Sequence, residues 1–457
     1  MPDFFGNLLR MLRGPRGSDV SFLCHKLLSE RGEASQTAVA QEVINAYQGM
    51  PPDKRLEFYQ MLCREFAPEQ PAILHAAADY QRAPGPATLS ALTSAVEPPR
   101  QELFRRINTA VHGTETMVAM RGDLLALIEK HPELTALDSD LRHLFRSWFN
   151  RGFLRLERVS WQTSARLLEK LIRYESVHEI HGWPDLRRRL EADRRCFAFF
   201  HPALGEEPVI FVEVALTKGL AGELEPLLDV RAPVLPSDQA DTAIFYSINN
   251  CLPGLRGVPF GNFLIKQVVT DLATEFPKLS AYATLSPLPR FARALLDQEN
   301  THGFTRDRLQ RLLADFHKEL ISAAGRKDSV DALFHLLKDP VRHRQVLIEP
   351  LRRLATAYLT QARCGGRRCD SVAAFHLSNG ARLERVNPFG NLRPYGLKDS
   401  FGVTVNYRYL FDDLEENHER FVRQDEIQVS RGLSRELHAV AKAWHTPGDK
   451  PAGQKKG

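Results

Sequence analysis

The stretch that decides the fold begins at residue 255 and reads Leu255-Arg256-Gly257-Val258-Pro259-Phe260-Gly261-Asn262. Its two glycines and its proline predict a loop. The loop leads directly into residues 263–276, where apolar side chains recur at helical spacing. The residues on the apolar face of this predicted helix are Leu264, Val268, Leu272 and Phe276. A strand-like stretch over residues 279–285 follows, so the order here is loop, helix and strand.

A loop of this kind is suited to binding phosphate. The N–H groups at the start of a helix have no partner within the helix, the helix dipole adds partial positive charge, and glycine allows close approach. Arg256 and Lys266 lie near enough in the sequence to add charge. The loop contains neither the Gly-Lys-Ser/Thr of a Walker A loop nor the pattern Gly-x-Gly-x-x-Gly. These features favour a pyrophosphate-bearing carrier such as coenzyme A, with a purely structural glycine turn as the alternative.

Upstream of this loop, three stretches rich in β-branched and aromatic residues predict strands, over residues 196–200, 207–216 and 242–248. Residues 18–150 instead carry apolar residues at helical spacing, interrupted by proline-rich turns. The sequence therefore predicts an α+β chain, in which a helical region precedes a mixed sheet that is flanked by helices.

Domain boundaries follow from these changes of pattern. We expect a helical domain for packing or oligomerisation over residues 1–150, and a sheet domain over residues 151–446 with a helical insertion at about 297–373. Residues 447–457 predict a disordered tail. At the other end, the basic amphipathic stretch from Phe4 to Arg13 predicts a first helix, with an organelle presequence as the alternative.

Charge is uneven along the chain. The 457 residues contain 61 Lys and Arg against 56 Asp and Glu, a net charge of +5, which is too small to indicate nucleic-acid binding. Residues 1–150 contain 16 basic and 18 acidic residues (−2), which leaves 45 and 38 (+7) for residues 151–457. The positive part is the predicted sheet domain, although most of the excess is expected on solvated helix faces. No apolar run reaches the roughly 20 residues of a membrane span, so no integral membrane segment is expected.

Six cysteines are scattered along the chain, which is typical of a protein in a reducing compartment. Cys364 and Cys369 flank Gly-Gly-Arg-Arg. A zinc site would need a second ligand pair at short spacing, and none follows. We therefore expect a flexible basic turn here, no metal, and no cysteine nucleophile.

Two polar residues are candidate catalytic groups. Ser286 lies at the C-terminal end of the predicted strand and precedes two prolines that end strand pairing. His376 lies within residues 374–381, which predict a strand that reaches an Asn-Gly turn. From the residues alone, a turn-forming serine and a structural histidine are the alternatives.

Seven segments, in order between about residue 140 and residue 412, together resemble the malonyl-CoA decarboxylase family. They are Arg158-Val159-Ser160-Trp161, Ala243-Ile244-Phe245-Tyr246-Ser247-Ile248, Gly254-Leu255-Arg256-Gly257-Val258, Phe263-Leu264-Ile265-Lys266, Leu285-Ser286-Pro287-Leu288-Pro289, Phe375-His376-Leu377-(x)-Asn379-Gly380 and Asn406-Tyr407-Arg408-Tyr409. Each segment alone is weak evidence, but seven in register are specific. The helical N-terminal region resembles the oligomerisation domain of that family.

The resemblance implies a catalytic domain with the GNAT acyltransferase fold, in which the loop before the central helix takes the coenzyme A pyrophosphate. Ser286 would be the proton acceptor and His376 the proton donor. Pro259 departs from the pattern, since animal members of the family carry glutamate there. The residues expected to line the malonyl-CoA site, including the charge from Lys266, are Arg256, Gly257, Val258, Pro259, Phe260, Gly261, Asn262, Lys266 and Tyr409.

The implied chemistry can be argued from the reaction itself. Loss of CO2 from a malonyl thioester leaves an enolate, for which the thioester is the electron sink, so we expect no metal or organic cofactor. Ser286 can hydrogen-bond the departing carboxylate, and His376 suits the protonation of C2 because imidazole titrates near neutral pH. A GNAT-type acyltransferase and a non-catalytic acyl-CoA sensor are the alternative functions.

The resemblance also implies self-association, as a homotetramer. The last five residues, Gly453-Gln454-Lys455-Lys456-Gly457, differ from the Ser-Lys-Leu peroxisomal signal of animal relatives. We therefore expect a cytoplasmic location.

Overall fold

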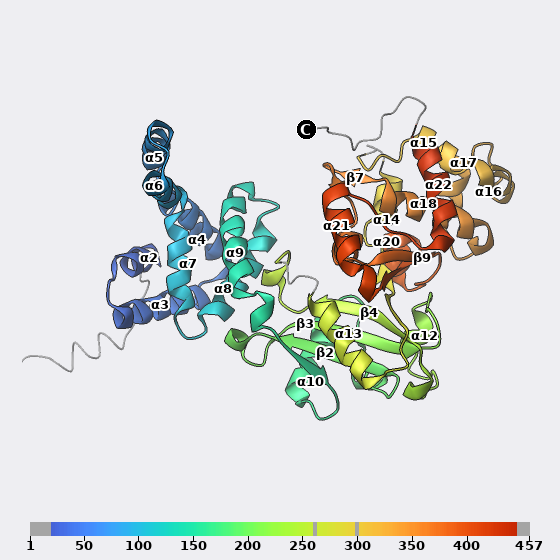
Figure 1. The fold of residues 1–457 in the computed structure, drawn as a ribbon, viewed down its shortest axis with the longest axis horizontal. Coiled ribbons are helices and arrows are strands. Elements are labelled where there is room, and N and C mark those ends of the chain that lie inside the picture. Colours follow the sequence, from blue (N-terminus) through green and yellow to red (C-terminus); the bar gives the residue numbers. More distant parts are fainter. Residues whose placement is uncertain (1–19, 259–262, 298–300, 446–457) are drawn as a thin grey trace, which may run out of the picture. The chain divides into compact units, whose positions relative to one another are not determined.

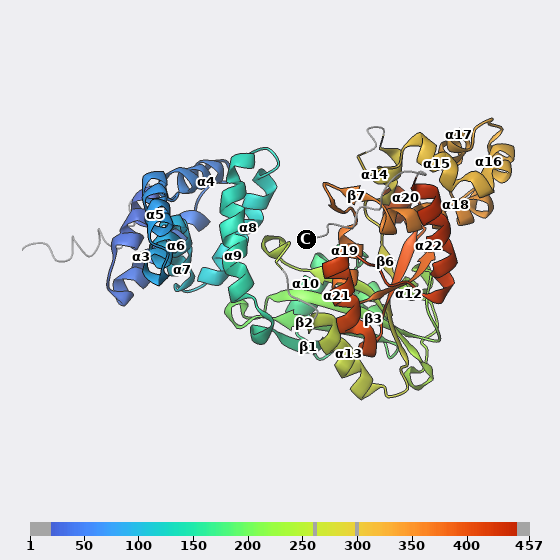
Figure 2. The same cartoon turned by 45° about the horizontal axis from the view of Figure 1, so that its top comes forward.

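The computed structural model describes residues 20–258, 263–297 and 301–445, and Figures 1 and 2 show it in two views. The chain divides into two compact units. The first consists of residues 1–155, 199–210 and 250–260, and the second of residues 156–198, 211–249 and 261–457. The helix predicted from Phe4 to Arg13 and the predicted tail lie outside the described residues.

Helices build most of the first unit. Three of them begin with a proline, Pro52, Pro86 and Pro99, a residue whose missing N–H costs nothing at the first position of a helix. The apolar spacing seen in the sequence packs into a core that includes Phe104 and Phe145. The helices are α2 (Val20–Ser29), α3 (Glu33–Gln48), α4 (Pro52–Glu65), α5 (Gln70–Arg82), α6 (Pro86–Val96), α7 (Pro99–Asn108), α8 (Gly113–Leu127) and α9 (Thr135–Trp148).

A mixed sheet of eight strands carries the second unit. Its order is β1-β2-β3-β4-β5-β10-β6, and β9 also pairs with β10. Strands β4 and β5 are parallel, whereas β10 is antiparallel to β5, β6 and β9. The strands are β1 (Arg155–Val159), β2 (Arg194–Phe200), β3 (Pro208–Thr217), β4 (Thr242–Asn250), β5 (Ala281–Thr284), β6 (Ser286–Pro287), β9 (Arg382–Asn387) and β10 (Thr404–Tyr409). The three strands predicted upstream of the loop and the helix predicted after it are confirmed, and with them the α+β class.

Helix α13 (Phe263–Glu275) is the helix predicted after the glycine-bearing loop, and it lies along the sheet near β3 and β4 (Figure 1). Its predicted apolar face is buried at Leu264, Val268 and Leu272. At its C-terminal end the Glu275 carboxylate accepts hydrogen bonds from the Arg195 guanidinium of β2, with the shortest N–O distance 2.6 Å. The hydrophobic face and this ion pair together hold α13 on the sheet.

Further helices surround the sheet. Among the described residues, no helix combines the length and the apolar character that crossing a membrane requires. The helices between and after the strands are α10 (Ala165–Tyr174), α11 (Trp183–Arg189), α12 (Glu225–Leu228), α14 (Phe291–Leu296), α19 (Ser371–Ser378), α20 (Pro394–Ser400), α21 (Leu414–Gln424) and α22 (Arg431–Trp444).

The segment predicted as a helical insertion contains α15 (Arg306–Leu312), α16 (His317–Ala324), α17 (Ser329–Leu336) and α18 (Arg344–Thr360). These helices lie together with α22 in both views (Figures 1 and 2). The segment then ends differently from the prediction. Strands β7 (Arg363–Cys364) and β8 (Arg367–Arg368) form a hairpin, and a disulfide joins Cys364 to Cys369. The expectation of a flexible turn with reduced cysteines is therefore wrong at this pair.

Candidate active site

Four polar side chains of the second unit form a continuous hydrogen-bonded chain. The Ser286 hydroxyl donates to Thr284 Oγ1 at 2.8 Å, and Ser286 Oγ lies 3.0 Å from His376 Nε2. On the other side of the imidazole, Nδ1 lies 2.8 Å from the Tyr409 hydroxyl oxygen. All four residues are at least nine-tenths buried. Titratable and hydroxyl groups therefore face one another away from bulk water, which is an arrangement typical of catalytic sites.

Strand β10 holds one half of this chain in place. It pairs with β6 through Val405 and Ser286, and with β5 through Tyr409 and Tyr282. Between these two pairings, the backbone N–H of Tyr407 donates to Thr284 Oγ1 at 3.1 Å. Thr284 and Ser286 are two residues apart, so the extended backbone presents both side chains on one face. Ser286 thus lies directly beyond the end of β5, as the sequence predicted.

His376 reaches the site from a helix, and the predicted strand over residues 374–381 is wrong. The Asp370 carboxylate accepts a hydrogen bond from the Ala373 N–H at 2.8 Å and caps the start of α19. At the other end, Gly380 has φ of +79°, the left-handed conformation that commonly terminates a helix. The Asn-Gly pair is therefore a helix stop here, although the same dipeptide often forms a hairpin turn. Helix α19 begins after Asp370 and ends before Gly380. It is too short for the spacing of its apolar residues to identify it as a helix.

Burial decides the charge of His376. Its ring stacks on the Tyr407 ring with the centroids 4.7 Å apart, and the loss of water around it lowers the pKa of His376 to about 3. The imidazole is therefore neutral in the free protein at pH 7. The expectation that it titrates near neutral pH is wrong, because that value belongs to a solvated imidazole.

Tyr409 determines which nitrogen of His376 carries the proton. Burial raises the pKa of Tyr409 well above its usual value, so the hydroxyl keeps its proton and needs an acceptor. Nδ1 of His376 is the acceptor within reach. We assign the proton of the neutral imidazole to Nε2, where it faces Ser286 Oγ. Donation then runs in one direction, from Tyr409 through His376 and Ser286 to Thr284.

A buried carboxyl group lies at the start of the helix that carries His376. Burial raises the pKa of Asp370 to about 6. The charged form of a buried carboxyl group is costly, which is the physical cause of this raised pKa. The Tyr358 hydroxyl interacts with this carboxyl group and favours its charged form less than burial disfavours it. Among the described residues, the buried Tyr407 hydroxyl has no hydrogen-bond partner.

The predicted phosphate loop begins in the first unit. Arg121 of α8 pairs with Asp138 at 2.8 Å and donates to the carbonyl oxygens of Gly254 at 2.6 Å and Arg256 at 2.8 Å. A Cβ atom at Gly254 would lie 1.8 Å from a backbone oxygen of α8, so only glycine fits there. The loop backbone is thus anchored to α8, while the Arg256 side chain is exposed.

The remaining predicted binding residues are placed as follows. Gly257 has φ of +75°, a conformation that favours glycine, and Val258 is buried beside it in the sequence. Lys266, on α13 of the second unit, pairs with Glu415 of α21 at 2.5 Å. The four residues that fall outside the described part of the chain are Pro259, Phe260, Gly261 and Asn262. The structure therefore brings Ser286, His376 and Tyr409 together in the second unit. Residues 256–258 belong to the first unit.

The sequence analysis missed three site residues, Thr284, Tyr407 and Asp370, although each of them left a signal in the sequence. Thr284 forms a Thr-x-Ser pair with Ser286, and Tyr407 forms a Tyr-x-Tyr pair with Tyr409. A spacing of two places both members of each pair on one face of a strand. Asp370 left only a capping signal, an acidic residue before a serine and a short apolar run, and the strand interpretation of the following residues hid it.

Comparisons with known proteins agree with this architecture. The family model described as "Malonyl-CoA decarboxylase C-terminal domain" matches residues 152–446, and the model described as "Malonyl-CoA decarboxylase N-terminal domain" matches residues 66–149. The mitochondrial malonyl-CoA decarboxylase of Anser anser anser is 34% identical over 346 residues, which are 73% of this chain and 68% of that protein. The Mus musculus enzyme is 33% identical over 353 residues, covering 75% of this chain and 72% of that protein.

Solved structures lead to the same family. The malonyl-CoA decarboxylase of Rhodopseudomonas palustris is 41% identical, with a TM-score of 0.79, and the match covers 91% of this chain and 98% of that one. The protein of the same name from Agrobacterium vitis is 42% identical, with a TM-score of 0.77 over 92% of this chain and all of that one. The chain therefore belongs to the malonyl-CoA decarboxylase family of carboxy-lyases.

Proposed function

We propose that this protein converts malonyl-CoA to acetyl-CoA and CO2 at the buried Ser286–His376–Tyr409 chain. The observation that carries the proposal is the contact between Ser286 Oγ and His376 Nε2 at 3.0 Å. It places a hydroxyl that can hydrogen-bond the substrate carboxylate next to an imidazole that can transfer a proton. Membership of the malonyl-CoA decarboxylase family supports the choice of substrate.

The reaction makes three demands on the site. The C2–carboxylate bond breaks and its electron pair moves onto the thioester, CO2 leaves, and the enolate takes one proton at C2, which solvent ultimately supplies. The thioester accepts the electron pair, so the proposal assigns no role to a metal or an organic cofactor. What the protein must supply is a poorly hydrated place for the carboxylate, donors for the enolate oxygen, and a proton.

His376 is proposed as the proton donor. In the free protein it is neutral, because burial holds its pKa near 3. An arriving carboxylate, and then the enolate, place negative charge beside the imidazole, and negative charge raises the pKa of a neighbouring histidine. We therefore expect the imidazole to take up a second proton with the substrate and to release it to C2. Ser286 lies between His376 and Thr284 and has one hydroxyl hydrogen, which it donates to Thr284 in the free protein. We propose that this hydrogen turns from Thr284 to the substrate and forms a hydrogen bond with the departing carboxylate.

The coenzyme A phosphates are proposed to bind the loop from Arg256 to Asn262, assisted by Lys266. The anchored backbone at Gly254 and Arg256 supports this role, since backbone that is already fixed at the start of the loop loses little entropy when it binds a ligand. Lys266 must exchange Glu415 for phosphate, and such an exposed ion pair costs little to break.

One assay tests the proposed function. Purified protein is incubated with malonyl-CoA and a chelator, without an acyl acceptor, and acetyl-CoA and CO2 are quantified. Stoichiometric formation of both products supports decarboxylation. Acyl transfer only after an amine is added would indicate an acyltransferase instead, and binding without turnover would indicate an acyl-CoA sensor. The Ser286→Ala protein serves as the matched control.

We also propose that the chain self-associates through its helical unit, as a homotetramer, and that it acts in the cytoplasm. Helices α5 and α6 pack on each other, yet α6 has no buried residue, and the side chains of Leu74, Leu89 and Val96 are 63%, 49% and 47% exposed. Apolar surface of this kind is typical of an interface. Light scattering during gel filtration tests the assembly, and Leu89→Glu should reduce the molar mass. Fractionation of the native cell tests the location.

A further inference from the structure

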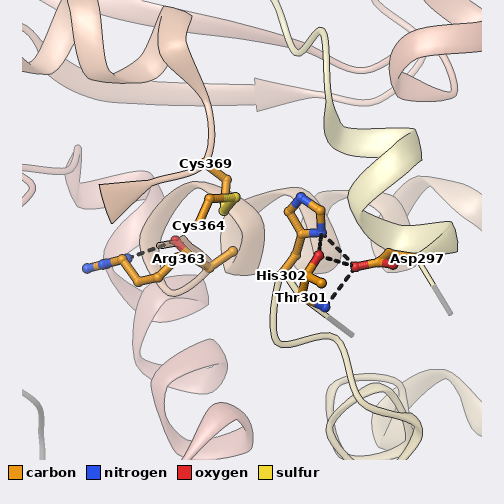
Figure 3. The surroundings of a disulfide bond; sticks show 7 residues. Asp297, Thr301, His302, Arg363, Cys364 and Cys369 are labelled. Carbon is orange, nitrogen blue, oxygen red and sulfur yellow. Dashed lines mark hydrogen bonds and ion pairs between the residues drawn. A yellow bond between two sulfur atoms is a disulfide. The ribbon is translucent and has the colours of Figure 1, made fainter. Parts of the chain in front are cut away.

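The disulfide hairpin places a histidine beside its two cysteines. Gly365 and Gly366 have φ of +56° and +79°, the pair of left-handed residues that a tight type I′ hairpin turn requires. The turn sets Cys364 opposite Arg367 and leaves Cys369 with its Cα 5.0 Å from that of Cys364. Figure 3 shows the pair beside His302, which precedes it by more than sixty residues in the sequence.

His302 completes a set of metal-binding groups. One ring nitrogen of His302 and the two sulfur atoms all lie within 4.8 Å of one another. Nδ1 of His302 is occupied, because it donates to the Asp297 carboxylate at 2.9 Å, and the same carboxylate accepts from the Thr301 N–H at 2.8 Å. A histidine that ligates a metal characteristically donates its other N–H to a carboxylate. We therefore assign the proton of His302 to Nδ1, which leaves the lone pair of Nε2 as the ligand for a metal ion.

The hairpin is held in place by contacts that do not involve the disulfide. Arg363 and Arg368 both donate to the Asp425 carboxylate, at 2.5 and 2.7 Å. Arg368 also donates to the carbonyl oxygens of Leu359 at 3.1 Å and Thr360 at 3.0 Å. Reduction of the disulfide therefore leaves the two thiols near His302. A nearly preformed site loses less entropy on binding an ion than a flexible turn would.

We propose that Cys364, Cys369 and His302 form, once the disulfide is reduced, a binding site for a thiophilic divalent cation such as Zn2+. Two thiolates neutralise the ion, and imidazole is the usual third partner in such sites. A tetrahedral zinc ion holds its ligand atoms roughly 3.6–3.8 Å apart, given bonds of about 2.3 Å to sulfur and 2.0 Å to nitrogen. Shifts of about 1 Å bring the three groups to that spacing. His302 and Cys364 are partly exposed, so a water molecule can supply the fourth ligand.

The disulfide and the bound metal ion exclude each other, because both need the sulfur atoms of Cys364 and Cys369. A dithiol delivers two electrons and two protons to the S–S bond, which becomes two thiols while the reductant becomes a disulfide. The cation then replaces the two thiol protons, which pass to solvent. Oxidation by another disulfide reverses the sequence and releases the ion. The same sulfur atoms thus alternate between a covalent link and a metal link, and the hairpin stays closed in both.

The site is separate from the decarboxylation chemistry, although Cys369 directly precedes Asp370, the cap of the helix that carries His376. Binding of a cation here is independent of whether the chain decarboxylates malonyl-CoA. The inference therefore needs a test that reads the metal itself and not the turnover of the enzyme.

Cobalt(II) is a suitable probe, because thiolate-bound Co2+ absorbs in the near ultraviolet by sulfur-to-metal charge transfer. The full-length protein is reduced with dithiothreitol, desalted without oxygen and titrated with Co2+ and then Zn2+. We expect one Co2+ per chain with the charge-transfer band, its displacement by Zn2+, and no binding by the oxidised protein. Absence of the band in reduced protein would overturn the proposal.

Variants assign the ligands. Cys364→Ser should abolish the charge-transfer band, and Cys369→Ser replaces it if the Cys364→Ser protein melts at a markedly lower temperature. His302→Gln should weaken Co2+ binding at least tenfold. Asp297→Asn should weaken it by about 10- to 100-fold, the usual effect of removing a carboxylate that orients a histidine ligand. Cys63→Ser, a half-buried cysteine of the first unit, should change nothing. An unaltered band in the Cys364→Ser or His302→Gln protein would contradict the site.

Discussion

His376 Nε2 lies 3.0 Å from Ser286 Oγ, although the two residues are 90 positions apart in the sequence. One comes from a short capped helix and the other from a two-residue strand. Their contact is buried, and the imidazole is neutral within it. The chemistry proposed for the protein depends on this pair.

His376→Asn should lower kcat by about 100- to 10,000-fold, the range expected when a proton donor is removed. KM for malonyl-CoA should change much less, because proton transfer to C2 occurs only in the transition state. Steady-state kinetics with malonyl-CoA measure both constants, and binding of acetyl-CoA controls for an intact pocket. Turnover close to that of the parent protein would remove His376 from the mechanism.

Ser286→Ala should also be severely impaired while the fold stays intact. The substitution removes the hydroxyl that bonds both His376 and Thr284, and it leaves the buried Nε2–H without an acceptor, which costs about 1–3 kcal/mol. Thermal melting checks the fold and decarboxylation assays check the rate. Full activity in this variant would reduce Ser286 to a turn-forming residue.

Tyr409→Phe tests the direction of the hydrogen-bonded chain. The ring remains, but the donor to His376 Nδ1 is lost, so the proton of the imidazole is no longer confined to Nε2. We expect kcat to fall by roughly 10-fold or more, a loss of about 1.4 kcal/mol.

Tyr407→Phe is the matched control for this substitution. It removes a hydroxyl that has no partner among the described residues and keeps the ring that stacks on His376. Its effect on kcat should be clearly smaller. Equal effects of the two substitutions would mean that the Tyr409 hydroxyl does not orient the imidazole.

Asp370→Asn should change how stability depends on pH. Burial raises the pKa of Asp370 to about 6, from the ordinary value near 3.8, so the folded state binds the proton more tightly than the unfolded state does. The stabilisation from the protonated form is complete below about pH 4 and is lost as the pH rises through 6. Above pH 6 the neutral asparagine avoids this loss, which is roughly 3 kcal/mol for two pKa units.

Melting temperatures at pH 4 and pH 7.5 measure the effect. The Asp370→Asn protein should melt higher than the parent at pH 7.5, and the difference should shrink at pH 4, where Asp370 is protonated. The amide oxygen can still cap α19, so the helix should persist. A difference that is the same at both pH values would show that the charge of Asp370 is not its cause.

Arg256→Ala and Lys266→Ala should each raise KM for malonyl-CoA, by about 10-fold or more if a charged phosphate contact is lost, with kcat less affected. Arg231→Ala removes one positive charge from a side chain that is 91% exposed and lies outside the loop, and it should leave KM unchanged. Unchanged KM in both loop variants would count against the loop as the phosphate site.

The sequence by itself determined the elements and the family. Strands of β-branched residues, the apolar face of α13 and the glycine-bearing loop are local features, and local spacing reveals them. Ser286 could be placed at a strand end for the same reason. His376 could be named as a candidate, but its helix was mistaken for a strand, because eight residues, or about two turns, are too few to show helical periodicity.

Only the tertiary structure decided the state of the site. Chain packing buries His376 and so makes it neutral, and strand β10 carries Tyr409 to its Nδ1 from 33 residues away. The same holds for the cysteines. From the sequence, Cys364 and Cys369 lacked a third ligand, yet His302 lies beside them in the fold. A pKa and a ligand set depend on which groups meet across long stretches of chain and on how much water they lose, and neither property is encoded in local spacing.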